Sequence, residues 1–113
     1  MRLPDKDFSV KVGPFRYDVQ RSEDVTNEGE AFGSVHHQNQ RIFLAPHMAP
    51  DKQAETFLHE LLHCIHTQTG LRHDLNSDKP PNDEQVVART SVALYQVIQD
   101  NPHIFGSGDG VQQ

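Results

Sequence analysis

His59, Glu60 and His63 have the residue types and the spacing that a metal-dependent hydrolytic site requires. Two histidines four positions apart lie one turn apart on a helix, and neutral imidazole is a preferred ligand of zinc. A catalytic zinc site combines three protein ligands with an open position for water and a nearby base. We therefore expect His59 and His63 to bind zinc (Zn2+) and Glu60 to act as general base and acid.

The motif requires a helix, and the apolar residues around it predict one. Six residues recur with the spacing of a single helical face: Ala54, Phe57, Leu58, Leu61, Leu62 and Ile65. Asp51 is the predicted N-cap and Gly70 the predicted C-terminal stop. His59 and His63 then lie about 40° apart around the helix axis, beside the apolar face. Because the chain has eight histidines, which makes an accidental match more frequent, this helical context strengthens the assignment.

The third zinc ligand must come from elsewhere, and Glu84 is the first candidate. It lies in the first turn of a second predicted helix, which begins near Asn82 and runs through Ile98. Glu84 shares its predicted face of this helix with Val87, Ser91, Leu94 and Ile98. If this face points inward, a carboxylate on it is costly unless it is paired or binds a metal. Asp83 is the alternative ligand. A structural role is also open, since both acids favour a helix N-terminus.

His66 is the second candidate ligand, but the helix geometry argues against it. At 1.5 Å per residue it lies roughly 10 Å along the axis from His59, which is too far for one ion on a straight helix. We expect it to be a surface histidine or to support a ligand, and Cys64 to be a small buried hydrophobic residue. Four side chains are candidate donors to a reaction oxyanion: Tyr17, His73, Tyr95 and His103. Of these, Tyr95 is predicted to be a core residue instead.

The motif in its context resembles small phage and prophage zinc metallopeptidases of the minigluzincin type, which are related to ImmA and IrrE proteins. The resemblance covers roughly residues 15 to 103 and is carried by four segments: 41–44, 56–63, 83–87 and 100–102. It implies that His59, His63 and Glu84 bind zinc and that Glu60 is the catalytic acid and base. It also implies a peptide or protein substrate, held as an added strand along a sheet edge, with residues 32–37 as the edge.

The remaining segments predict an α+β fold. Alternating residues indicate strands at 8–12 and 15–19, on either side of Gly13-Pro14, and a hairpin of 31–37 and 41–45. We expect a small antiparallel or mixed sheet of three or four strands, packed on the motif helix and crossed by the Glu84 helix. Residues 21–30 and 71–81 are predicted loops, and His36 and His37 are predicted to lie at a solvated turn. Residues 1–105 form one predicted domain, and 106–113 a flexible tail.

Composition excludes several classes of function. A net charge of −6 with scattered basic residues argues against nucleic-acid binding, and no apolar run is long enough to cross a membrane. The single cysteine and the lack of a signal-like segment favour a cytoplasmic protein of a bacterium or of a phage-infected cell. The leading expectation is a zinc metalloendopeptidase. The alternatives are a metal-stabilised binding or regulatory protein without proteolytic activity and a hydrolase of non-peptide amides.

Overall fold

The computed structural model describes residues 2–23 and 32–106 of the chain. Four strands, β1 (Phe8–Val12), β2 (Phe15–Arg21), β3 (Gly33–His36) and β4 (Arg41–Leu44), form one sheet in the order β1-β2-β4-β3. Four helices follow: α1 (Pro50–Gln68), α2 (Leu71–Leu75), α3 (Asp83–Asp100) and α4 (Pro102–Phe105). The predicted α+β fold with a small N-terminal sheet is therefore confirmed. Residues 107–113 of the predicted tail 106–113 and most of the predicted loop 21–30 lie outside the described residues.

The sheet is mixed, because two antiparallel hairpins join through a parallel pair. β1 pairs with β2, and β3 pairs with β4, both antiparallel, whereas β2 and β4 run parallel with Val19 opposite Ile42. Gly13 turns the first hairpin with a φ of 59°, a conformation that glycine adopts without strain. β3 lies at one edge of the sheet, as predicted.

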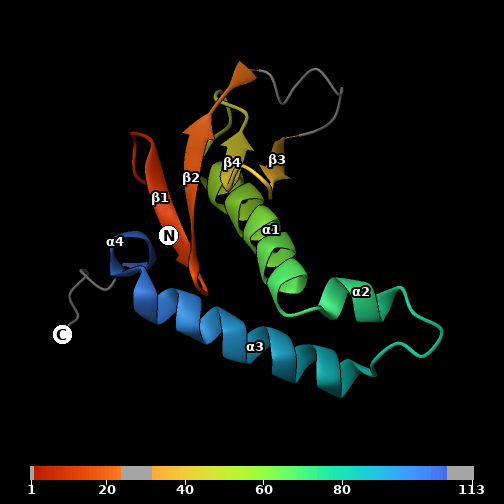
Figure 1. Ribbon diagram of the computed structural model, residues 1–113. Helices are drawn as coiled ribbons and strands as arrows, with labels where there is room; N and C mark the ends of the chain where they lie inside the picture. Colours follow the sequence, from red (N-terminus) through yellow and green to blue (C-terminus); the bar gives the residue numbers. More distant parts are fainter. Residues whose placement is uncertain (1, 24–31, 107–113) are drawn as a thin grey trace.

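The core lies between the sheet and α1, which packs against the sheet in Figure 1. Alternate strand residues point into it, among them Val10, Val19 and Ile42, and α1 contributes Phe57 and Leu61. The buried face of α1 is narrower than predicted, because Leu58 and Leu62 are each 37% exposed. The prediction that Leu58 and Leu62 belong to the buried face was therefore wrong. Cys64, by contrast, is buried as expected.

The helix boundaries follow local chemistry. α1 begins one residue before Asp51, with Ala49 as N-cap and Pro50 in the first turn, where proline's missing N–H costs nothing. The predicted N-cap Asp51 is therefore wrong, whereas Gly70, with a φ of 77°, does follow the end of α1. α3 begins after Asn82, whose side chain forms a reciprocal capping box with Gln85.

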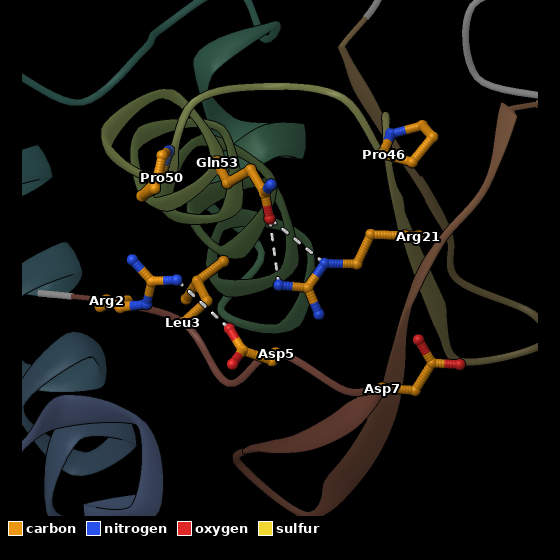
Figure 2. A pocket seen from close by; sticks show the side chains of 8 residues that line it. All are labelled: Arg2, Leu3, Asp5, Asp7, Arg21, Pro46, Pro50 and Gln53. Carbon is orange, nitrogen blue, oxygen red and sulfur yellow. Dashed lines mark hydrogen bonds and ion pairs between the residues drawn. The ribbon is translucent and has the colours of Figure 1, made fainter.

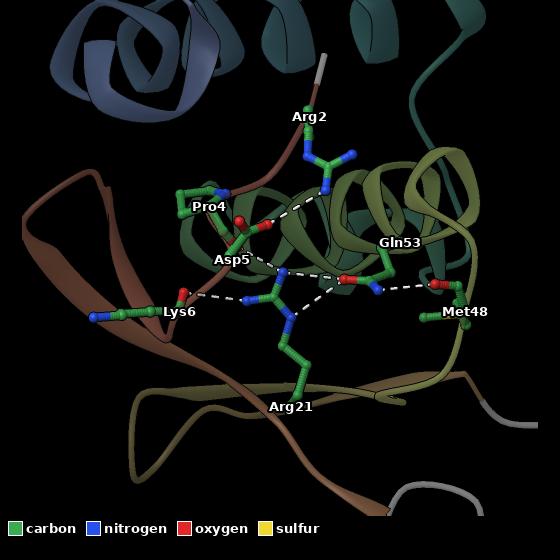
Figure 3. A network of polar contacts seen from close by, with 7 residues as sticks. All are labelled: Arg2, Pro4, Asp5, Lys6, Arg21, Met48 and Gln53. Carbon is green, nitrogen blue, oxygen red and sulfur yellow. Dashed lines mark hydrogen bonds and ion pairs between the residues drawn. The ribbon is translucent and has the colours of Figure 1, made fainter.

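Two polar anchors tie distant segments to this core. Buried Asn101 accepts from the Lys11 N–H at 2.8 Å and donates to the carbonyls of Lys11 and Val97, which fixes the end of α3 against β1. Arg21 donates to the carbonyls of Pro4 and Lys6 and to the Gln53 side chain, which in turn donates to the Met48 carbonyl (Figure 3). The N-terminal segment is thus held against the start of α1.

α2 and α3 extend the fold beyond the end of α1. α2 follows α1 directly and lies on the same side of it as β3 in Figure 1, whereas residues 71–75 were predicted to be loop. α3 then runs back past the ends of α1 and the sheet, and Ile104 of α4 is buried in the core. None of the helices in the described ranges has the length and apolar character that a membrane span needs.

Candidate metal centre and its cleft

His59 and His63 lie on consecutive turns in the second half of α1, with both side chains exposed. Their Nε2 atoms are 3.3 Å apart, and the two rings meet edge to face at 77°. Zinc binds imidazole nitrogen at about 2.0–2.1 Å, so two nitrogens of a tetrahedral site are separated by about 3.3 Å. The pair therefore has the spacing that two ligands of one zinc ion need. Without an ion, the same distance allows a hydrogen bond between neutral rings.

Glu60 lies between the two histidines in sequence and is buried, with 7% of its surface exposed. Burial raises the pKa of its carboxyl above the ordinary value, while the neighbouring His59 and His63 act in the opposite direction. β3 covers it closely: a methyl group at Gly33 would lie 3.2 Å from Glu60 Cγ. A carboxyl group with a raised pKa beside a metal site is suited to exchange protons near neutral pH.

Two cavities adjoin Glu60 along the groove between α1 and the edge strand β3. The first cavity, of about 420 Å³, is lined by Glu60 and His63 of α1, by His37 next to β3 and by residues of α2. The second cavity, of about 350 Å³, is lined by Glu60 and His59 and reaches Phe32 and Lys52. The buried carboxyl group thus borders both cavities. This arrangement gives an extended ligand room on either side of Glu60.

His37 belongs to this site, although the sequence suggested only a residue at a solvated turn. It is half-buried, with the Tyr17 hydroxyl 3.2 Å from Nδ1 and the Thr67 hydroxyl 3.4 Å from Nε2. Burial lowers the pKa of His37, and Arg72 and His63 lower it further. His37 is therefore neutral at neutral pH. The signal that could have indicated it is its position at the end of the edge strand, which directs it toward the motif helix.

The candidate third ligands are not gathered around the histidine pair. Glu84 is exposed in the first turn of α3. The part of its predicted face that lies nearest to it does not point inward, since Val87 is 60% exposed, although Leu94 further along the helix packs against the core. The prediction that Glu84 lies in an inward-facing row was therefore wrong. Asp83 is also exposed. Within residues 2–23 and 32–106, no group of three or more histidine, cysteine, aspartate or glutamate side chains is placed to hold a metal ion.

His66 lines the first cavity with His63, but its Nε2 lies 3.3 Å from the Thr90 hydroxyl of α3. Burial lowers the pKa of His66, and His63 adds to this effect. It therefore joins α1 to α3 and stays neutral at neutral pH.

The other residues considered from the sequence lie away from the motif or reach it indirectly. Tyr17 is buried and borders the site only through His37. Tyr95 is 65% exposed, so the prediction of a core residue was wrong. His103 contacts the Ser9 carbonyl on β1. His73 is exposed on α2.

A further cavity, of about 320 Å³, lies at the opposite end of α1 (Figure 2). Figure 2 shows Arg21 and Gln53 hydrogen-bonded to each other on one side of it and the Arg2–Asp5 ion pair on another. Its lining contains none of the motif residues. Because Arg2 pairs with Asp5 and Arg21 is bonded to Gln53 and to the carbonyls of Pro4 and Lys6, we interpret this cavity as part of the anchor of the N-terminal segment.

Comparison with protein-family models places the chain in a known family. The model of the IrrE N-terminal-like domain, Peptidase_M78, matches residues 15–101, which include the whole of α1 and most of the sheet. Comparisons with curated proteins and with solved structures give no match. The matched segment covers most of the 113 residues, and the chain therefore belongs to the IrrE N-terminal-like domain family of peptidases.

Proposed function

We propose that this protein is a zinc metallopeptidase of the gluzincin type, with His59 and His63 as zinc ligands and Glu60 as catalytic acid and base. The observation that carries the proposal is the 3.3 Å separation of the two Nε2 atoms beside a buried carboxyl group. Membership of a peptidase family supports it. We further propose that it acts in the cytoplasm of a bacterium or of a phage-infected cell.

The residues of the cleft have distinct roles in this mechanism. When bound, zinc supplies Lewis-acid chemistry, which polarises the scissile carbonyl and lowers the pKa of water. Glu60 accepts the proton of the attacking water and later delivers it to the leaving amine. If the Tyr17 hydroxyl donates to Nδ1 of His37, Nε2 of that ring carries a proton and can donate to the developing oxyanion.

The edge strand β3 is the proposed binding site for the peptide backbone. Its outer side has no neighbouring strand in the described sheet, so a substrate in extended conformation can pair with it. Such a peptide would pass Glu60 and place its flanking side chains in the two cavities.

Glu84 is the proposed third ligand, with Asp83 and His66 as alternatives. Because Glu84 is exposed and does not contact the histidines, its recruitment requires the first turn of α3 to move toward α1. The residues between α2 and α3 include no regular secondary structure that would prevent this movement. His66 requires no movement of α3, but it would have to give up its contact with Thr90.

Metal content tests the proposal. Tag-free wild-type protein should contain one zinc per chain by inductively coupled plasma mass spectrometry, and His59→Ala and His63→Ala should lose it. Glu84→Ala, Asp83→Ala and His66→Ala, measured in parallel, identify the third ligand as the variant that also loses zinc. Protein that neither contains nor takes up zinc would refute the metal site.

A second function, a metal-stabilised binding or regulatory protein, is supported by the open edge of β3, which can take up a partner as an added strand without cleaving it. Glu60→Gln separates the two functions. In a peptidase it abolishes peptide cleavage while zinc and fold are retained. In a binding protein it leaves function unchanged.

A further inference from the structure

Arg72 differs from the other arginines of the chain. Five have a polar partner within the described residues: Arg2 with Asp5, Arg16 with Ser9, Arg21 with Gln53, Arg41 with Gln20, and Arg89 with Asp74. Within those same ranges, the Arg72 guanidinium forms neither a hydrogen bond nor an ion pair. A guanidinium stays protonated throughout the physiological pH range and offers five donors in a planar fork.

The free guanidinium belongs to the first cavity, which also contains Glu60 and His63. Arg72 lies at the start of α2 and lines this space of about 420 Å³ opposite His37 of the β3 hairpin. The positive charge of Arg72 acts on the groups of this cavity, since it contributes to lowering the pKa of His37. Because a guanidinium keeps its proton throughout the physiological pH range, Arg72 provides a fixed positive charge in this cavity.

The second cavity has a basic residue as well, but that residue is already engaged. Lys52 forms an ion pair with Glu55 at 3.0 Å and lies 5.0 Å from the centre of the Phe32 ring. Its charge is therefore balanced within the cavity. The two sides of Glu60 thus differ, because the unbalanced positive charge lies on the His63 side alone.

We propose that Arg72 makes the first cavity a carboxylate-binding subsite, so that the enzyme favours peptides with a carboxylate close to the scissile bond. This inference rests on the proposed peptidase function and specifies its substrate class. A carboxylate matches the guanidinium fork in a bidentate arrangement. The net charge of −6 makes acidic peptides poor ligands for the rest of the surface, which increases the importance of one local arginine. The carboxylate can belong to an Asp or Glu side chain or to the peptide C-terminus.

Cleavage-site profiling tests the preference. Zinc-supplied wild type, Arg72→Ala and Arg72→Glu are incubated with a degenerate peptide library, and the products are sequenced by mass spectrometry. Wild type should enrich Asp and Glu at one position beside the cleaved bond by about fivefold, as expected for a partly exposed ion pair. Arg72→Ala should remove the enrichment, and Arg72→Glu should replace it with Lys and Arg. Arg16→Ala, an exposed arginine on β2, is the matched control and should behave as wild type.

A binding measurement keeps this inference separate from catalysis. Fluorescein-labelled peptides are titrated by anisotropy into metal-free Glu60→Gln protein, with and without Arg72→Ala. One pair of peptides differs by Glu or Gln at the enriched position, or at each position in turn if no cleavage occurs. A second pair ends in a free carboxylate or an amide, which distinguishes the two sources of the carboxylate. The acidic peptides should bind about fivefold more tightly, and this advantage should shrink at 0.5 M salt and vanish with Arg72→Ala.

The outcomes separate the subsite from the proposed function. Cleavage without acidic enrichment, or with enrichment unchanged by Arg72→Glu, overturns the subsite and leaves the peptidase function standing. If acidic peptides bind preferentially through Arg72 but no peptide is cleaved, the subsite is supported and the peptidase function is refuted. Equal binding of both members of each pair, or no binding at all, overturns the subsite.

Discussion

The close approach of β3 to α1 at Gly33 allows a quantitative test of how the site is built. An alanine methyl group at this position would lie 2.9 Å from Thr56 Cγ2, 3.1 Å from the Phe43 carbonyl oxygen and 3.2 Å from Glu60 Cγ. Ordinary contacts between such atoms are about 3.5–4.0 Å, so Gly33→Ala must push the strand and the helix apart by roughly 0.5 Å. Glycine is therefore needed here for space.

The cost of Gly33→Ala follows from the extent of this overlap. Overpacking of a tight interface costs about 1–3 kcal/mol. In a domain of this size, each kcal/mol lowers the melting temperature by about 4 °C. We expect Gly33→Ala to melt about 4–12 °C below wild type in a thermal unfolding experiment followed by circular dichroism. If the proposed function holds, peptide cleavage should decline as well, because Glu60 must move.

A compensating substitution distinguishes this explanation from a general loss of stability. The nearest contact of the added methyl group is Thr56 Cγ2, which Thr56→Ser removes while keeping the hydroxyl group. The double variant Gly33→Ala/Thr56→Ser should therefore be more stable than the sum of the two single effects predicts, by about 0.5–2 kcal/mol. Ser34→Ala, the next residue of β3, is the control. A melting temperature of Gly33→Ala within 1 °C of wild type, or strictly additive effects, would refute the reasoning.

Three further predictions concern zinc, the Asn101 anchor and Cys64. In scanning calorimetry, zinc at a hundredfold excess over its Kd should stabilise wild type by about 2.7 kcal/mol and should not stabilise His59→Ala. Equal stabilisation of the two proteins would contradict His59 as a zinc ligand. Asn101→Ala removes the three hydrogen bonds of a buried side chain and should lower the free energy of unfolding in urea by about 2–4 kcal/mol. A change below about 0.5 kcal/mol would show that the contacts with β1 are not formed. Burial raises the pKa of the Cys64 thiol from 9.0 to about 12, so the unfolded chain loses this proton first and stability falls as the pH rises above 9. Urea unfolding at pH 8, 9 and 10 should show a slope steeper than that of Cys64→Ala by up to about 1.4 kcal/mol per pH unit, and equal slopes would be inconsistent with the buried thiol.

Local patterns predicted those parts of the fold whose signals are local. The alternation on either side of Gly13 predicted the strands β1 and β2, and Asn82 predicted the start of α3 within one residue. The pairing of β2 with β4 is different, because residues 22–40, including β3, separate the two strands and no short-range pattern specifies the pairing. α2 was predicted to be part of a loop, because five residues are too few to show a helical period.

The motif itself was predictable because both of its requirements are local. A spacing of four residues and an amphipathic helix together bring two imidazoles into ligand distance, whatever the rest of the chain does. His37 and Arg72 were harder to identify. They adjoin Glu60 only because the β3 hairpin and α2 flank α1 on the same side, which is a property of the tertiary structure.

The position of Glu84 shows why the third ligand is the least predictable part of the site. α3 has apolar residues on more than one face, with Val86 beside Val87 and Val97 beside Ile98, and adjacent residues differ by about 100° around a helix. The periodicity therefore did not determine which face packs inward. Tertiary contacts determine it instead: Arg89 binds Asp74 and the Thr69 carbonyl, and Val97 is buried. These contacts turn Val87, Tyr95 and Ile98 outward, and Glu84 with them.

If Glu84 binds zinc, the contacts of Arg89 must loosen or the first turn of α3 must bend. Arg89→Ala, which releases this restraint, should then increase zinc affinity, whereas unchanged affinity would favour a ligand that does not depend on α3.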